Sequence, residues 1–113
     1  MSKYDIMIIA HITKDTLEYR GKVTPFTGGA AYFSSFAAKR SNAKICVVTK
    51  LARRDFGVLD ELKREGIEVI ALPSSKSTSI ENVFESDDFD KRKARLISQA
   101  DPFQPEDIPK AEA

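Results

Sequence analysis

Three residue types near the start of the chain have the chemistry of a functional site: a glycine pair, an aspartate and a histidine. Gly28 and Gly29 stand directly before an alanine- and aromatic-rich segment, and free backbone N–H groups at a helix start suit an anion. The same pair suits a tight turn into the helix. A Walker A loop needs Gly-Lys-Ser/Thr five positions after its first glycine, and a dinucleotide loop needs Gly-x-Gly-x-x-Gly. The sequence contains neither motif, so spacing alone leaves the turn and the anion site open.

The aspartate and the histidine lie close to the first apolar run. Asp15 follows that run, at the carboxyl end of a predicted strand, where ligands bind in open α/β sheets. It is interpreted either as an acceptor for substrate hydroxyls or as a solvated loop or capping aspartate. His11 has no second ligand or nucleophile at motif spacing, which favours a structural role. No metal-ligand pattern occurs, and the basic cluster from Lys91 to Arg95 is interpreted as a hairpin flank, with phosphate contact as the alternative.

Composition excludes several broad classes of function. With 18 basic and 17 acidic side chains the formal net charge is +1, so no overall field favours a nucleic-acid or membrane partner. Cys46 is the sole cysteine and lies in an apolar run, which predicts a buried thiol in a reducing compartment and no internal disulfide. The apolar run 6–10 is too short to span a bilayer and lacks a signal-peptide cleavage site. A cytoplasmic location is therefore expected.

The elements that would position these residues alternate between strands and helices. Apolar, β-branched runs predict buried strands, and apolar residues three and four apart predict helices. The predicted strands are 6–12, 44–49 and 68–72, and the predicted helices run from 29 or 30 to about 41 and from a cap at Asp55 to an αL residue at Gly66. This order implies right-handed crossovers and a parallel sheet flanked by helices, an α/β fold.

Shorter alternating segments predict additional β-structure outside that sheet. Residues 17–24 form one predicted hairpin, and residues 77–84 with 94–98 form another. Pro105 followed by acidic residues is a good helix start. Since the sequence ends at Ala113, that helix would have no room to finish, and we interpret the chain as a fragment of a longer protein.

Taken together, these motifs resemble the N-terminal half of the ribokinase-like sugar kinases, the PfkB carbohydrate kinase family, in an archaeal-type member. The resemblance covers nearly the whole chain. It rests on Asp15 after the opening strand, Gly28-Gly29-Ala30-Ala31, the strand 43–50, Asp55-Phe56-Gly57, residues 62–67, Ser77-Thr78-Ser79-Ile80-Glu81-Asn82, Ala100-Asp101-Pro102 and residues 105–109. The resemblance implies a ribokinase-like fold with its core in residues 4–16 and 27–73, a small β lid in residues 17–26 and 76–99, and an unfinished helix in 100–113.

The resemblance also implies a function. Asp15, Gly28 and Gly29 would contact sugar hydroxyls, since a carboxylate accepts from paired hydroxyls and glycine lets a flat sugar approach the backbone. Tyr19, Thr78, Glu81 and Asn82 would belong to the lid, which excludes water from the transferred phosphoryl group. The family reaction transfers the γ-phosphate of ATP to a sugar or nucleoside hydroxyl with Mg²⁺. The chain departs from the family pattern at Phe33, where an asparagine is preferred, and at Asn42 and Ala52, where glycines are preferred.

The family's catalytic aspartate belongs to a Gly-Ala-Gly-Asp motif in its C-terminal half. No glycine follows Gly66, so neither this motif nor the nucleotide site is in the chain, and we expect the chain alone to lack kinase activity. The alternatives are a non-catalytic sugar-binding or oligomerising module, and a truncated remnant without function. Exposed edges and an apolar face of the lid strands also raise the hypothesis of a homodimer.

Overall fold

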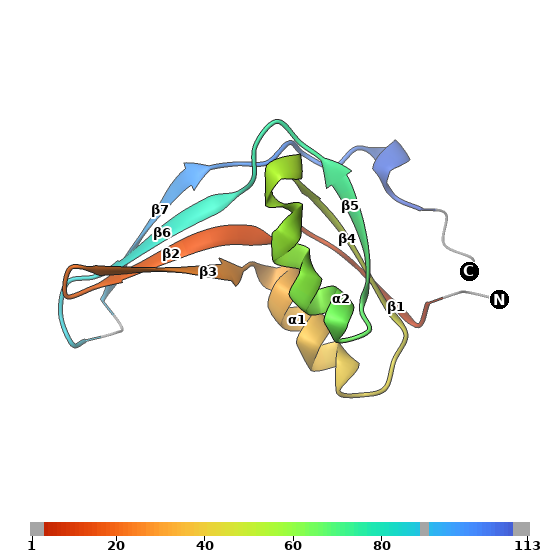
Figure 1. Cartoon of the computed structure of the whole chain (residues 1–113), viewed down its shortest axis with the longest axis horizontal. Coiled ribbons are helices and arrows are strands. Elements are labelled where there is room, and N and C mark those ends of the chain that lie inside the picture. Colours follow the sequence, from red (N-terminus) through yellow and green to blue (C-terminus); the bar gives the residue numbers. More distant parts are fainter. Residues whose placement is uncertain (1–3, 89–90, 110–113) are drawn as a thin grey trace.

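The computed structural model describes residues 4–88 and 91–109 and contains two β-sheets joined at a narrow junction (Figure 1). In chain order the elements are β1 (Ile6–Ile9), β2 (Thr13–Tyr19), β3 (Lys22–Gly28), α1 (Ala30–Lys39), β4 (Ile45–Leu51), the 3-10 helix η1 (Arg53–Leu59), α2 (Asp60–Arg64), β5 (Glu68–Pro73), β6 (Ser79–Phe84), β7 (Arg92–Ser98) and the 3-10 helix η2 (Pro105–Asp107).

The first sheet is parallel, with strand order β1-β4-β5. Its middle strand carries the run Ile45-Cys46-Val47-Val48, and these four side chains are almost completely buried. Branched apolar residues on both parities are what a strand covered on both faces requires. The predicted α/β fold with a parallel sheet is therefore confirmed.

Helices α1 and α2 lie side by side over this sheet (Figure 1). The core beneath them contains Val47 and Leu51 from β4, with Leu59 and Leu62 from the η1–α2 segment. Gly66 ends α2 with a φ of 79°, the left-handed conformation predicted for a helix C-terminus. The second helix differs from the prediction at its start: residues 53–59 form a 3-10 helix whose N-cap is Ala52, so Asp55 is not the cap.

The second sheet extends away from the first (Figure 1) and has the order β3-β2-β6-β7, with β2 and β6 parallel and the outer pairs antiparallel. Its first hairpin is longer than predicted, since the ladder runs from Thr13–Gly28 to Tyr19–Lys22. Arg20 and Gly21 both have positive φ, 52° and 77°, as a two-residue primed turn requires.

The predicted end of the first strand is wrong because the chain leaves the parallel sheet early. Strand β1 ends at Ile9 rather than Ile12. Ile12 is fully buried, and its N–H donates to the hydroxyl of Thr49 at 2.8 Å rather than to a β4 carbonyl. Asp15 consequently lies within β2 of the four-stranded sheet and not in a loop beyond the parallel sheet.

The C-terminal segment crosses the carboxyl ends of the parallel strands. Lys50 of β4 donates to the carboxylate of Asp107 at 2.8 Å, and Asp101 accepts from Ser75 just beyond β5. The helix predicted from Pro105 is a single 3-10 turn, and Ile108 is already extended. Residues 110–113, onto which that helix was predicted to continue, lie outside the described residues. Within the described ranges, no helix has the length and apolar character needed to cross a membrane.

Candidate functional site: a pocket between the two sheets

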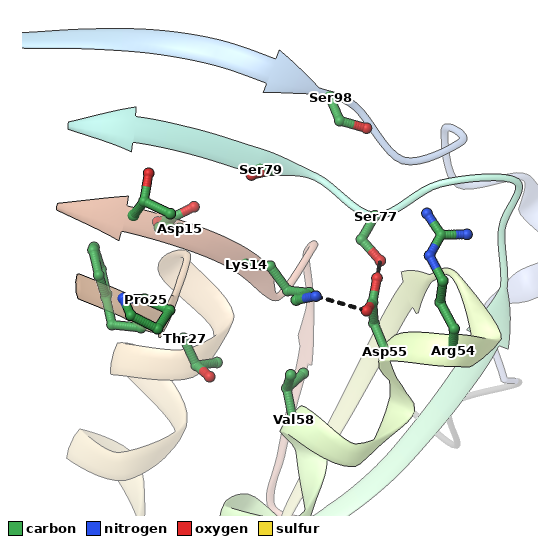
Figure 2. A pocket seen from close by; sticks show the side chains of 12 residues that line it. Lys14, Asp15, Pro25, Thr27, Arg54, Asp55, Val58, Ser77, Ser79 and Ser98 are labelled. Atoms are coloured by element: carbon green, nitrogen blue, oxygen red, sulfur yellow. Dashed lines mark hydrogen bonds and ion pairs between the residues drawn. The ribbon is translucent and has the colours of Figure 1, made fainter. Parts of the chain in front are cut away.

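A pocket of about 510 Å³ lies where the four-stranded sheet meets η1 (Figure 2). Its lining combines hydroxyl groups, charges of both signs and a few apolar side chains. The lining residues are Lys14, Asp15, Thr16, Pro25, Phe26, Thr27, Arg54, Asp55, Val58, Ser77, Ser79 and Ser98. Many hydroxyls with a few apolar contacts suit a small polyhydroxylated ligand, because each of its polar groups needs a hydrogen-bond partner once buried.

Asp55 is the most heavily bonded charged group in this pocket. Its two carboxylate oxygens accept from Lys14 Nζ at 2.8 Å and from Ser77 Oγ at 2.6 Å (Figure 2), and its side chain is only 9% exposed. The hydrogen bonds from Lys14 and Ser77 hold the pKa of the Asp55 carboxyl below its usual value, and the bond from Lys14 has the larger effect. Through these two bonds the carboxylate of Asp55 joins η1 to β2 and to the segment before β6.

Asp15 is the second carboxylate of the pocket and is differently placed. The residue is 8% exposed, and its Oδ1 accepts the N–H of Ile80 at 3.0 Å. Among the described residues its Oδ2 has no hydrogen-bond donor, and this oxygen lies on the side of Gly28, where an added Cβ would meet it at 2.5 Å. The lack of a side chain at Gly28 therefore lets this carboxylate oxygen lie against the backbone of β3.

The glycine pair has a steric explanation. Gly29 has a φ of 95°, and a Cβ there would lie 2.6 Å from the carbonyl oxygen of His11. Glycine tolerates both the positive φ and this close approach, whereas other residues do not. The pair thus forms the tight turn from β3 into α1. Of the two interpretations that the sequence left open, this is the turn.

The remaining residues predicted for the site are distributed over the four-stranded sheet and its junction. Asn82 pairs with Leu17, two residues after Asp15, and so lies on the same face of the sheet as Asp15. Glu81 pairs with Thr16, lies on the opposite face and contacts Arg95 at 3.7 Å. Of the predicted site residues, only Asp15 lines the pocket. The predicted residues that do not line it are Gly28, Gly29, Tyr19, Thr78, Glu81 and Asn82.

Tyr19 and Thr78 occupy opposite ends of the same sheet. Tyr19 is at the far end of β2, where its hydroxyl bonds the carboxylate of Asp87. Thr78 is buried at the junction, where its carbonyl accepts the N–H of Lys14 at 2.9 Å and its hydroxyl accepts the N–H of Ala100 at 3.0 Å. Tyr19 is therefore remote from the pocket, and Thr78 joins neighbouring segments through both its carbonyl and its hydroxyl.

His11 has the structural role predicted for it. Its Nε2 donates to the carbonyl of Asp101 at 3.0 Å, and its ring stacks on Phe103 with centroids 4.7 Å apart. These contacts tie the segment between β1 and β2 to the C-terminal segment, so the histidine stabilises the fold.

Of the residues that line the pocket, sequence reasoning assigned a site role only to Asp15; the charged residues Lys14, Arg54 and Asp55, and Ser77, were among those it missed. Lys14 and Arg54 directly precede Asp15 and Asp55 in the sequence, which is a weak signal because most such neighbours on a surface are simply solvated. The Asp55 contacts join residues 41 and 22 positions apart, and no local pattern reports a pairing at that distance. Arg54 is exposed, and Figure 2 shows its guanidinium beside Ser77.

The residues present do not fit a metal site. Within residues 4–88 and 91–109, no group of three or more His, Cys, Asp or Glu side chains is placed to hold an ion. A hard cation such as Mg²⁺ takes several oxygen ligands. No step through Mg²⁺ is therefore derived for this chain.

Comparison with known proteins supports the fold. No protein-family model and no curated protein matches the sequence. Among solved structures, the chain is similar to a sulfate complex of a pyrophosphate-dependent kinase in the ribokinase family, with 37% identity and a TM-score of 0.81, over 89% of this chain and 36% of that chain. A pyrophosphate-dependent kinase in the ribokinase family complexed with a pyrophosphate analogue and myo-inositol matches with 34% identity and a TM-score of 0.78, over 89% and 34%.

A more distant structure shows the fold alone. It is a nucleoside kinase from Burkholderia thailandensis in complex with inosine, with 17% identity and a TM-score of 0.67, over 83% of this chain and 36% of that chain. The chain spans about a third of the length of all three structures. Over that third the chain shares the fold of kinases of the ribokinase family.

Proposed function

We propose that the chain is the substrate-binding, N-terminal part of a kinase of the ribokinase family that phosphorylates a hydroxyl of a sugar or cyclic polyol. The observation that carries this proposal is Asp15. Its nearly buried carboxylate keeps one oxygen without a donor, in a pocket rich in hydroxyls. A carboxylate in that position accepts strong, charge-assisted hydrogen bonds from ligand hydroxyls.

The roles of the other residues follow from their positions. Gly28 lets the Asp15 carboxylate lie close to the backbone of β3, where any other residue would displace it. The amide nitrogen of Asn82 donates to the carbonyl of Thr16 at 3.3 Å, which leaves its amide oxygen to accept from a ligand on the same face. The four-stranded sheet, with Tyr19, Thr78 and Glu81, is the lid of this proposal and excludes water from the reacting group.

The substrate class is a neutral polyol. The two structures at 34–37% identity are pyrophosphate-dependent kinases, and one of them is complexed with myo-inositol. A ring bearing many hydroxyls matches the hydroxyl-rich lining of the pocket. Sugars share this chemistry, and a nucleoside is the third candidate because a structure with this fold is complexed with inosine.

Activity requires a segment that the chain does not contain. Phosphoryl transfer needs a base or water-positioning group and an anion site for the transferred phosphate, and no glycine follows Gly66 to form the expected Gly-Ala-Gly-Asp motif. The chain by itself is therefore proposed to be inactive. The complete enzyme would use ATP with Mg²⁺, or pyrophosphate, which the more similar structures favour. It is proposed to be a cytoplasmic, archaeal-type member of the PfkB group.

The alternative function is a non-catalytic sugar-binding or oligomerising module. The observation in its favour is the apolar side chains exposed on the four-stranded sheet, including Leu96 at 56% and Phe26 at 38%. Two copies packed through this sheet would cover them. Sedimentation that shows only monomer at high concentration contradicts the dimer.

Isothermal titration calorimetry with myo-inositol, fructose, ribose and inosine tests the binding proposal. We expect one of these ligands to bind and Asp15→Asn to weaken its affinity about tenfold or more, the range for losing a hydrogen bond to a charged group. Glu106→Gln, an exposed acid of the η2 turn, is the matched control and leaves affinity unchanged. Absence of binding by all four ligands, or equal binding by Asp15→Asn, contradicts the proposal.

A phosphoryl-transfer assay tests the proposed inactivity separately. The chain is incubated with each ligand and either ATP with Mg²⁺ or pyrophosphate, and the phosphorylated product is measured. We expect no product above the blank. Turnover would show that the described residues suffice for catalysis and would overturn that part of the proposal without affecting the binding result.

A further inference from the structure

The two sheets of this protein share no strand pairing among the described residues. They are joined by short connections, and the pocket lies between the four-stranded sheet and η1, which packs beside the parallel sheet. Such a pocket has a defined shape only if the four-stranded sheet holds a defined position relative to η1 and the parallel sheet. The contacts at the junction therefore decide the geometry of the pocket.

Side-chain contacts at this junction converge on Asp55. From η1, next to the parallel sheet, its Oδ1 accepts from Lys14 Nζ at 2.8 Å, and Lys14 belongs to β2 of the four-stranded sheet. Its Oδ2 accepts from Ser77 Oγ at 2.6 Å, in the segment that leads into β6. One carboxylate thus binds both parallel central strands, β2 and β6, at their N-terminal ends.

The same two partners are tied into the backbone. Ser77 Oγ also accepts the N–H of Ala52 at 3.0 Å, directly after β4. The N–H of Lys14 donates to the carbonyl of Thr78, the residue after Ser77. Asp55 and Ser77 are 9% and 5% exposed, so water competes little for the bond between them. The Lys14 side chain is 49% exposed, so its ion pair with Asp55 is screened more strongly than the bond from Ser77.

We propose that Asp55 is a positioning residue that holds the four-stranded sheet at one angle to the parallel sheet and thereby sets the shape of the pocket. Asp55 acts through Lys14 and Ser77. Its loss would remove the bonds that Lys14 and Ser77 make to η1, while the hydrogen bonds inside each sheet remain. The four-stranded sheet would then rotate as a unit, as packed layers do about a hinge. The proposal concerns the ligand-free chain and does not depend on the proposed function.

The test is a distance measurement between the two sheets. Spin labels are attached at two exposed positions, Lys22→Cys on β3 and Lys63→Cys on α2. Pulsed electron–electron double resonance then gives the distribution of distances between the two labels. The native Cys46 is fully buried and takes no label. The parent chain should give one narrow distribution, and Asp55→Ala a broader distribution with a shifted mean.

The matched control is Asp107→Ala. Asp107 also accepts a lysine at 2.8 Å, from Lys50 of β4, and the two side chains are 16% and 11% exposed. That pair fastens η2 to the parallel sheet, and neither residue bonds Asp55, Lys14 or Ser77. Asp107→Ala should therefore leave the distribution as narrow as in the parent chain, although it removes a comparable ion pair.

The outcomes separate positioning from general stabilisation. Broadening in Asp55→Ala alone supports the proposal. A parent-like distribution in Asp55→Ala, or equal broadening in Asp107→Ala, overturns it. If Asp55→Ala does not fold, Lys14→Met is measured in its place, since it removes one of the two bonds and keeps the apolar stem of the side chain. Broadening in Lys14→Met then supports the proposal, and an unchanged distribution overturns it.

Discussion

Strands β4 and β7 have the same length but contribute to the fold in different ways. In β4 every residue except Lys50 is buried, whereas in β7 every residue except Ser98 is exposed. Burial of apolar surface is the main source of folding free energy, so the parallel sheet supplies most of the stability. The four-stranded sheet depends on its backbone ladder and on the junction, which is the arrangement expected of a part that moves relative to a rigid core.

The largest effect should come from the core of the parallel layer. Leu62→Ala removes a fully buried side chain beneath the helices and should lower the free energy of unfolding by about 2–5 kcal/mol. Urea denaturation followed by circular dichroism measures this loss. The control is Leu96→Ala on β7, 56% exposed, which should change stability by less than about 0.5 kcal/mol. Equal losses would contradict the division of stability between the sheets.

The next effect concerns the passage between the sheets at Gly29. A Cβ here meets the His11 carbonyl oxygen at 2.6 Å while φ is 95°, so Gly29→Ala should cost about 1–3 kcal/mol through backbone strain. Gly57→Ala is the matched control, because nothing lies within 4 Å of its added Cβ. Thermal unfolding of both variants makes the comparison. A Gly29→Ala variant as stable as Gly57→Ala would show that the junction is looser than described.

An effect of similar size, but dependent on pH, should come from Asp55. Because Lys14 and Ser77 lower the pKa of its carboxyl in the folded state, its contribution is present above the unfolded pKa of about 3.9. It is lost as the pH falls through the folded value. Asp55→Asn should therefore be less stable than the parent by about 1–3 kcal/mol near neutral pH.

The difference between the parent and Asp55→Asn should narrow as the pH falls below the unfolded pKa of about 3.9 and through the lower folded pKa of the parent carboxyl. Urea midpoints measured between pH 7 and pH 2.5 follow this difference. A gap that stays constant across the range would mean that the Asp55 charge contributes nothing to the junction.

The smallest effect should come from the far end of the four-stranded sheet. Asp87 there accepts from Arg20 at 2.8 Å and from Tyr19, but both partners of the ion pair are well exposed. Exposed pairs are screened by water and salt. Asp87→Asn should leave the unfolding midpoint unchanged within error. A clear loss of stability would show that the tip of this sheet contributes to the fold as a buried region does.

Much of the fold is predictable because its determinants are local. The run Ile45-Cys46-Val47-Val48 is apolar on both parities, which only a strand covered on both faces requires, and the position of Gly66 predicts the helix end. The long first hairpin is less predictable. Thr13, Lys14 and Thr16 are polar, so the alternation that marks its beginning is weak, and only the ladder with β3 defines it.

The site was predictable only in part. Asp15 and the glycine pair stand out in the sequence, and the structure brings Gly28 next to the Asp15 carboxylate. Asp55 was expected to cap a helix because it precedes apolar helical spacing, but its carboxylate instead binds two distant residues. A local capping rule cannot anticipate partners that only packing brings within reach.

By itself, then, the sequence determined the order of strands and helices and the parallel core, since apolar periodicity and turn residues act over a few positions. Tertiary structure alone decided which polar side chains meet between the sheets. Lys14, Asp55 and Ser77 are far apart in the chain and polar, and their hydrogen bonds exist only because the two sheets dock. The pocket is a product of that docking, and its shape depends on one buried carboxylate.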